Sequence, residues 1–178
     1  MAHFEIGIDP GMTGGLAVFQ VSAKDGIQLV KSMRMPVEDS NRCKAKKTKR
    51  ISSEVLADTL AVFAPRMVHI ELVNAMPARD KAGNTIQGIS STFNFGFSTG
   101  SIESVIHAFA IPITYTVPSV WKKHYALLKT QKIDAVHKAN EYWPEHNFTR
   151  AVDSGRADAA LIGLYGILKF KGELSEKN

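Results

Sequence analysis

The first third of the chain alternates short apolar runs with turns. Residues 3–9, 16–21 and 27–34 are mostly apolar, and glycine-containing turns separate them. Each run is long enough for one strand, and such short connections join antiparallel neighbours. The pattern therefore predicts a three-stranded antiparallel meander.

After residue 50 the spacing of apolar residues changes to that of a helix and then back to that of a strand. Apolar residues recur at helical spacing over about 53–64, and a short apolar run follows at 67–73. We predict a helix for the first and a buried strand for the second. The polar residues 74–91 are expected to form a loop.

The sequence pattern of residues 92–110 fits both a strand and a helix. Three phenylalanines alternate as in a strand, whereas Gly96, Gly100 and Ser104 recur every four residues. We favour a helix, because the apolar residues after Gly100 also have helical spacing. Farther along, the pattern predicts a strand, a short helical turn and two helices, in that order: 112–117, 118–125, about 132–143 and about 155–170.

This order of elements predicts one α/β domain over residues 1–178. Three antiparallel strands come first, and later strands that are separated by helices favour parallel crossover pairing. The expected fold is a mixed five-stranded sheet with helices on both faces.

Composition agrees with an ordinary globular domain, because 44% of the 178 residues are hydrophobic and 22% are charged. No apolar run approaches the roughly 18 residues that cross a bilayer, and the N-terminus lacks the pattern of a signal peptide. The single cysteine, Cys43, excludes an intrachain disulfide. We therefore expect a cytoplasmic protein with no membrane partner.

The net charge of +5 is concentrated in one segment. Eight basic and two acidic residues lie between Lys31 and Arg50, so the rest of the chain is nearly neutral. We expect a basic, flexible loop over 36–52. Such a segment suits a phosphate backbone or an anionic membrane surface, and the alternative is a solvated loop that only keeps the protein in solution.

Three acidic residues lie in or beside apolar segments. Asp9 ends the first strand, Glu71 lies within a buried strand, and Asp158 begins an apolar helix. Buried carboxylates need partners, and a shared divalent cation would serve all three. Oxygen ligands suit Mg²⁺ or Mn²⁺, whereas one cysteine and no histidine pair at metal spacing give no zinc site. The alternative is that each acid faces water.

The chain resembles the RuvC-type Holliday junction resolvases of the ribonuclease-H-like superfamily. Residues 8–17 (IDPGMTGGLA) resemble their opening strand–turn–strand, 70–74 (IELVN) their second acidic strand, and 156–161 (RADAAL) their C-terminal acidic helix. Residues 94–100 and 118–123 (PSVWKK) resemble the intervening helix and a basic segment. The resemblance runs in order over nearly the whole chain and looks closest to phage-type members.

The resemblance implies a ribonuclease-H-like fold, a homodimer and symmetric cutting of four-way DNA junctions. For a phage-encoded protein, the compartment would be the cytoplasm of a bacterial host. We hypothesise that Asp9, Glu71 and Asp158 hold two Mg²⁺ ions roughly 3.5–4 Å apart. Mn²⁺ is expected to substitute for Mg²⁺, and no small-molecule cofactor is expected.

One position departs from the family pattern. The family usually has an acid or a histidine about three residues before the last aspartate, and this chain has Gly155 there. Asp153 is a candidate for the missing catalytic ligand. It is equally a candidate for capping the N-terminus of the last helix.

Candidate DNA contacts come from the turn after the first strand, the loop after Glu71 and the basic segments. Trp121 and Phe93 could stack on bases, although packing in the core is the favoured interpretation for both. The candidate DNA-binding residues are Thr13, Arg42, Lys44, Lys46, Lys47, Lys49, Arg50, Asn74, Arg79, Lys81, Lys122, Lys123 and Lys132.

Three alternative functions remain open at this point. The same acids would serve a nuclease that cuts RNA, flaps or duplex DNA. A protein that binds junctions without cutting them is a second alternative. The turn at residues 9–14 also resembles the first phosphate loop of actin-like sugar kinases and ATPases, but those proteins need a second such loop and a duplicated domain, and neither is found in this sequence.

Overall fold

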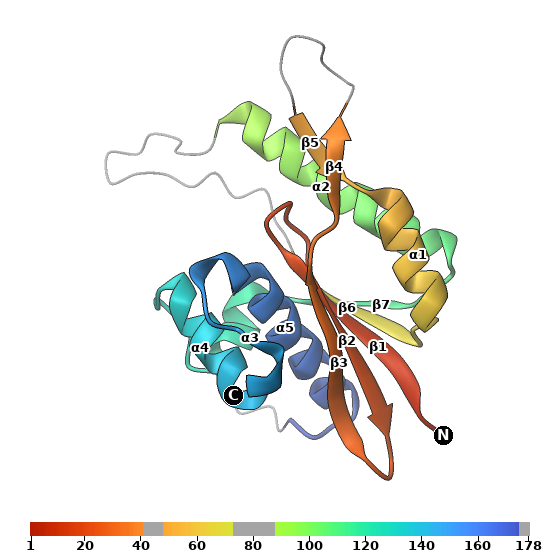
Figure 1. Ribbon diagram of the computed structural model, residues 1–178, viewed down its shortest axis with the longest axis vertical. Helices are drawn as coiled ribbons and strands as arrows, with labels where there is room; N and C mark the ends of the chain where they lie inside the picture. The colour runs from red at the N-terminus through yellow and green to blue at the C-terminus, as the bar shows by residue number, and fades with distance from the viewer. Residues whose placement is uncertain (41–47, 73–87, 175–178) are drawn as a thin grey trace.

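A five-stranded mixed sheet forms the centre of the protein (Figure 1). The structure is a computed structural model that describes residues 1–40, 48–72 and 88–174. The strands lie in the order β3-β2-β1-β6-β7. Their bounds are His3–Asp9 for β1, Gly15–Ser22 for β2, Gly26–Arg34 for β3, Met67–Glu71 for β6 and Ile113–Thr116 for β7.

The direction of the strands confirms the predicted topology. Strand β2 is antiparallel to both β1 and β3, whereas β6 is parallel to β1 and β7 is parallel to β6. Strands β1, β3, β6 and β7 therefore all run the same way. Their carboxyl ends lie at the same end of the sheet, and this is where Asp9, Arg34 and Glu71 are found.

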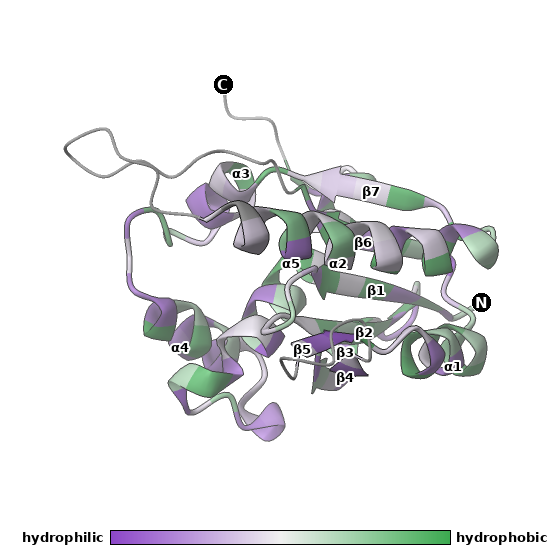
Figure 2. Ribbon diagram, turned by 90° about the horizontal axis from the view of Figure 1, so that it is seen from above, coloured by the Kyte–Doolittle hydropathy of each residue, from purple (hydrophilic) through white to green (hydrophobic). Residues whose placement is uncertain are grey.

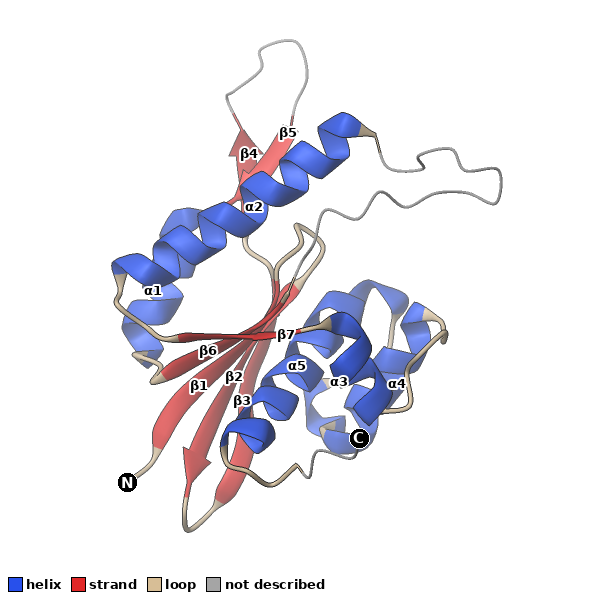
Figure 3. Ribbon diagram, turned by 180° about the vertical axis from the view of Figure 1, so that it is seen from behind, coloured by secondary structure: helices blue, strands red, loops and turns tan. Residues whose placement is uncertain are grey.

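Helices cover both faces of the sheet, also as predicted (Figure 3). Helices α1 (Ser53–Phe63) and α2 (Ile89–Ala108) lie on one face. The other face carries α3 (Pro118–His124), α4 (Lys132–Tyr142) and α5 (Ser154–Phe170). None of the helices in the described residues is long and apolar enough to span a membrane.

Alternation along the strands divides the core into two layers. Ile6 and Ile8 of β1 pack with α1 and α2, whereas Phe19 of β2 packs with α4 and α5. Since successive side chains of a strand point to opposite faces, Glu5, Gly7 and Asp9 face α5. The same alternation places His69 and Glu71 of β6 on the α5 face.

Helix α5 lies directly on the sheet, because glycines remove the side chains between them. A Cβ atom on Gly7 would lie 2.2 Å from the Ala159 carbonyl oxygen and 2.5 Å from the Gly163 Cα. A Cβ on Gly166 would lie 2.3 Å from Nδ1 of His69. This close contact fixes where Asp158 of α5 sits above the sheet.

A polar chain of hydrogen bonds crosses the buried α5 face. His69 is fully buried, with Nε2 2.6 Å from Glu5 Oε2 and Nδ1 2.6 Å from Thr114 Oγ1. His3 Nε2 lies 2.8 Å from the other oxygen of Glu5. Burial alone would raise the pKa of Glu5, but the hydrogen bonds from His69 and His3 outweigh it and lower that pKa. The buried Glu5 carboxylate is thus fully partnered.

The prediction of a loop over 36–52 is wrong for the residues near its two ends, which form strands. Val37–Ser40 and Thr48–Ile51 form a separate antiparallel hairpin, β4 and β5, which is mostly hydrophilic (Figure 2). Val37 and Ile51 pair across the hairpin and pack with the α1–α2 core. Charged residues dominate the rest of the two strands, so their apolar signal is too weak to mark them in the sequence. Residues 41–47 lie outside the described residues.

Candidate functional site

The fold brings Asp9, Glu71 and Asp158 to one end of the sheet. Asp9 ends β1 and Glu71 ends the neighbouring parallel strand β6, in register through the pair Ile8–Ile70. Both side chains face α5 by strand alternation. Asp158 comes from the first part of α5, which packs on β1.

The charges of the three acids act on one another. Burial raises the pKa of Asp9 to about 7, and repulsion from Asp158 and Glu71 adds to the shift. Burial likewise raises the pKa of Asp158 to about 6, with Glu71 contributing. Lys122 opposes both shifts, since its positive charge favours the ionised carboxylates. These acids lie within electrostatic range of one another, although their elements are far apart in the sequence.

Neighbouring groups orient two of the acids. The backbone N–H of Gly11, in the turn after β1, donates to the Asp9 carboxylate. The indole Nε1 of Trp121, which is fully buried in α3, donates to Glu71 Oε1 at 2.9 Å. The oxygen Oδ1 of Asp158, by contrast, is buried and has no hydrogen-bond partner among the described residues.

The three acids supply oxygen donors of the kind that hard cations prefer. Their carboxylates lie at the same end of the sheet, and the unpartnered buried oxygen of Asp158 is a group that a cation would satisfy. In the described part of the chain, however, no three His, Cys, Asp or Glu side chains already stand close enough together to hold a metal ion. The negative charges of these acids repel one another, and this repulsion contributes to the raised pKa of Asp9.

Gly155 cannot carry the side chain that the family pattern expects. A Cβ on Gly155 would lie 2.1 Å from the Thr13 carbonyl oxygen and 2.6 Å from the Gly14 Cα. The start of α5 therefore packs directly on the β1–β2 turn. Contact between the two backbones has taken the space that an acid or a histidine would need.

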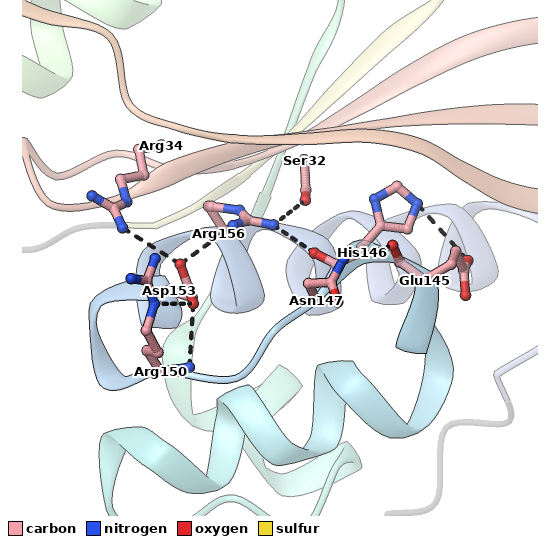
Figure 4. Close-up of polar contacts among 8 residues, drawn as sticks. All are labelled: Ser32, Arg34, Glu145, His146, Asn147, Arg150, Asp153 and Arg156. Carbon is pink, nitrogen blue, oxygen red and sulfur yellow. Dashed lines mark hydrogen bonds and ion pairs between the residues drawn. The ribbon is translucent and has the colours of Figure 1, made fainter.

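The carboxylate of Asp153 forms ion pairs with arginine side chains (Figure 4). It is 1% exposed, and its carboxylate contacts Arg34, Arg150 and Arg156. Burial opposes ionisation, but the Arg150 backbone N–H and the arginine charges lower the pKa of Asp153. These contacts favour a structural role near the start of α5. That Asp153 is a fourth catalytic ligand stays a prediction without geometric support.

The predicted DNA contacts lie in different parts of the structure. Lys122 and Lys132 lie close enough to the acids to influence Asp158 electrostatically. Thr13 is exposed in the turn beside Asp9, and Lys123 is exposed on α3. Lys49 and Arg50 lie on β5, where Arg50 Nε pairs with Glu38 Oε1 at 2.7 Å. The other predicted DNA contacts lie outside the described residues: Arg42, Lys44, Lys46, Lys47, Asn74, Arg79 and Lys81.

The structure gives different results for Trp121 and Phe93, the two residues considered for stacking on bases. Trp121 is buried, as the favoured interpretation expected. Phe93 is 61% exposed and stacks on Phe97 of the same helix, with 6.4 Å between ring centroids. Packing of Phe93 in the core is therefore wrong, because the N-terminal half of α2 extends beyond the sheet (Figure 1).

Sequence reasoning missed the arginines around Asp153. The spacing was visible, since Arg150 and Arg156 lie three residues before and after Asp153. Nothing in the local pattern, however, indicates that Arg34 joins them from β3, 119 positions earlier than Asp153. That contact depends on how α5 packs against the edge of the sheet.

The sheet order, the strand directions and the helices on both faces define a ribonuclease-H-like fold. In particular, the chain has the fold of RuvC. It is similar to Thermus thermophilus RuvC in complex with a Holliday junction substrate, with a TM-score of 0.63 and 17% identity over 95% of this chain and 96% of that chain. A second structure of T. thermophilus RuvC gives a TM-score of 0.60 at the same identity and coverage.

A yeast mitochondrial Holliday junction resolvase is less similar, with a TM-score of 0.49 and 13% identity over 96% of this chain and 86% of that chain. No family model matches the sequence, and no curated protein matches it significantly. The expected RuvC-type fold is confirmed, and the likeness to phage-type members stays a prediction.

The raised pKa values predict how stability depends on pH without a divalent cation. Between the ordinary aspartate pKa, near 3.8, and the folded values of about 7 and 6, the folded protein binds more protons than the unfolded chain. The free energy of unfolding should therefore fall as pH rises from about 4 to 7. Asp9→Asn removes the larger contribution, so its stability should exceed that of the parent at pH 8. Urea unfolding in EDTA at several pH values measures this, and parallel profiles for the two proteins would contradict it.

Proposed function

We propose that this protein is a metal-dependent endonuclease that cuts four-way and related branched DNA junctions. The observation that carries the proposal is that Asp9, Glu71 and Asp158 lie at the same end of the sheet, near enough for their charges to act on one another. The RuvC fold supports it, and one RuvC structure with that fold is a complex with a Holliday junction substrate. The proposal accounts for three carboxylates that lie near one another and repel one another.

The three carboxylates would hold Mg²⁺, with Mn²⁺ as a substitute. The bound metal would supply an activated water and would stabilise the oxygen that leaves the phosphodiester. The protein's own groups prepare this site. Gly11 orients Asp9, and Trp121 holds one oxygen of Glu71. The unpartnered Oδ1 of Asp158 remains available as a ligand.

Basic residues beside the acids would position the DNA backbone. Lys122 and Lys132 flank the carboxylates, and each would neutralise a phosphate near the bond that is cut. Lys123 and Thr13 are exposed near the same end of the sheet. The hairpin residues Lys49 and Arg50 would contact arms of the junction farther from the site. The contacts predicted for residues outside the described ranges remain part of the proposal, with Asn74 expected to enter the junction beside Glu71.

We also propose a homodimer that uses the outer surface of α1 and α2. An open groove of about 720 Å³ lies between these helices, lined mainly by small and apolar residues that include Gly100, Val105 and Phe109. A Cβ at Gly96 or Gly100 would meet nothing within 4 Å, so these glycines do not serve packing on the sheet. A second copy would cover the groove and give a two-fold protein for a two-fold junction. Sedimentation that shows only monomer at micromolar concentration would contradict the dimer.

Cleavage of a labelled four-way junction tests the function. We expect cutting with Mg²⁺, none with EDTA, and weaker cutting of linear duplex, flap and RNA–DNA hybrid substrates. Binding without cutting under all metal conditions would identify a junction-binding protein instead. A preference for the hybrid or the flap would keep the nuclease chemistry but replace the proposed substrate.

A further inference from the structure

The carboxylate of Asp153 contacts three arginines (Figure 4). Arg150 and Arg156 are its neighbours in sequence, and Arg34 comes from β3. Oδ1 lies 3.3 Å from Arg156 Nη1 and 3.5 Å from Arg34 Nη2, and Oδ2 lies 3.7 Å from Arg150 Nε. The backbone N–H of Arg150 also donates to Oδ2 at 3.2 Å. Three guanidinium groups share one carboxylate, so the cluster carries a net charge of +2.

The three arginines are not equivalent. Arg156 is mostly buried and has further partners, since its Nη2 donates to Ser32 Oγ and to the His146 carbonyl oxygen, and its guanidinium lies over the Phe148 ring. The side chains of Arg34 and Arg150 are 53% and 71% exposed. A guanidinium carries five N–H donors, so a single long contact with Asp153 leaves donors that can bind another anion. Arg156 therefore has a structural role, whereas the side chains of Arg34 and Arg150 are exposed to solvent.

The position of Arg34 relates the cluster to the three acids. Asp9 pairs with Gly15, and Gly15 pairs with Arg34 on the far side of β2. Residues directly opposite one another in antiparallel strands point to the same face, so Arg34 and Asp9 share the α5 face. Two strand spacings of about 4.8 Å place their Cα atoms about 10 Å apart. The cluster therefore lies beside the acids, at the same end of the sheet.

We infer that Arg34 and Arg150 form a binding site for a backbone phosphate of the strand to be cut. This inference rests on the proposed function and adds a contact outside its basic segments. A guanidinium fork matches a phosphate in shape and charge. At this distance, the bound phosphate would belong to a nucleotide close to the one held at the acids. Asp153 is a positioning residue that holds the two guanidinium groups next to each other.

Salt dependence of junction binding tests the site, measured by fluorescence anisotropy in EDTA so that no cutting occurs. The double variant Arg34→Ala/Arg150→Ala should bind a labelled four-way junction at least tenfold more weakly than the parent. Its slope of log K against log salt should be shallower by about 2, because two phosphate contacts are lost. Arg66→Ala, which removes an exposed arginine near the opposite edge of the sheet, should leave both quantities unchanged.

A second double variant separates phosphate binding from misfolding. Arg34→Lys/Arg150→Lys keeps both charges but loses the planar forks, so the slope should stay close to the parent value while affinity falls by a smaller factor. The inference is overturned if the alanine variant keeps the parent slope and affinity, or if the lysine variant loses the slope as the alanine variant does. Failure of the parent protein to bind any junction would overturn the proposed function as well. Binding without cutting would overturn the nuclease activity but still test this site.

Discussion

Replacing Asp9 by asparagine is expected to abolish junction cleavage and to leave junction binding intact. Asp9 ends the central strand β1 and is repelled by both Asp158 and Glu71, so its carboxylate faces the other two acids. Asparagine has nearly the same shape but cannot supply the negative charge that a divalent cation needs. Removal of a catalytic group of this kind lowers the rate by about 10⁴-fold or more.

The measurement is a single-turnover assay on a labelled four-way junction with Mg²⁺, combined with anisotropy in EDTA. Asp25→Asn is the matched control, because Asp25 is exposed in the turn between β2 and β3, at the opposite end of the sheet from the acids. We expect the control to cut and bind as the parent does. If Asp9→Asn cuts at the parent rate, the carboxylates are not the catalytic site.

Introducing a side chain at Gly155 should strongly destabilise the protein instead of restoring a missing ligand. The Cβ of Gly155→Ala would meet the Thr13 carbonyl and the Gly14 Cα, which are backbone atoms and cannot rotate away. Overpacking costs about 1–3 kcal/mol and occasionally more. We expect about 4 kcal/mol here, because the clash requires α5 to move from the sheet. At this chain length, that loss lowers the melting temperature by roughly 8–16 °C.

Gly96→Ala provides the opposite result as a control for Gly155→Ala. Gly96 lies inside α2, does not line the groove proposed as the dimer surface, and a Cβ there would meet nothing within 4 Å. Alanine there should stabilise the helix by about 0.5–1 kcal/mol. Thermal unfolding of the two variants compares a glycine required by packing with one that is not. A stable Gly155→Ala protein would mean that α5 does not rest on the β1–β2 turn.

Regular patterns allowed the sheet and most helices to be predicted from the sequence. The apolar runs of β1, β2 and β3 and the helical spacing of α5 are local signals, and each element formed close to its expected bounds. The β4–β5 hairpin was missed because its strands are short and charged. Its two apolar contacts, Val37 and Ile51, become visible only when the α1–α2 core is assembled.

The three acids were predictable for a related reason. Charged residues beside apolar runs are costly unless something binds them, and this signal needs no knowledge of the fold. The reason for Gly155 and the partners of Asp153 could not be inferred in that way. Both depend on how closely α5 approaches the sheet, which is set by contacts between residues distant in sequence.

The backbone contact between α5 and β1 also determines which part of the site can adjust. Gly7 and Gly163 touch through main-chain atoms, so no side chain there can change rotamer and alter the spacing. The separation between the backbones that carry Asp9 and Asp158 is thus a fixed dimension of the fold. Glu71 has a longer side chain, and its position depends on the hydrogen bond from Trp121. Accommodation of ions with different radii, such as Mg²⁺ and Mn²⁺, would therefore fall to Glu71 and its indole partner.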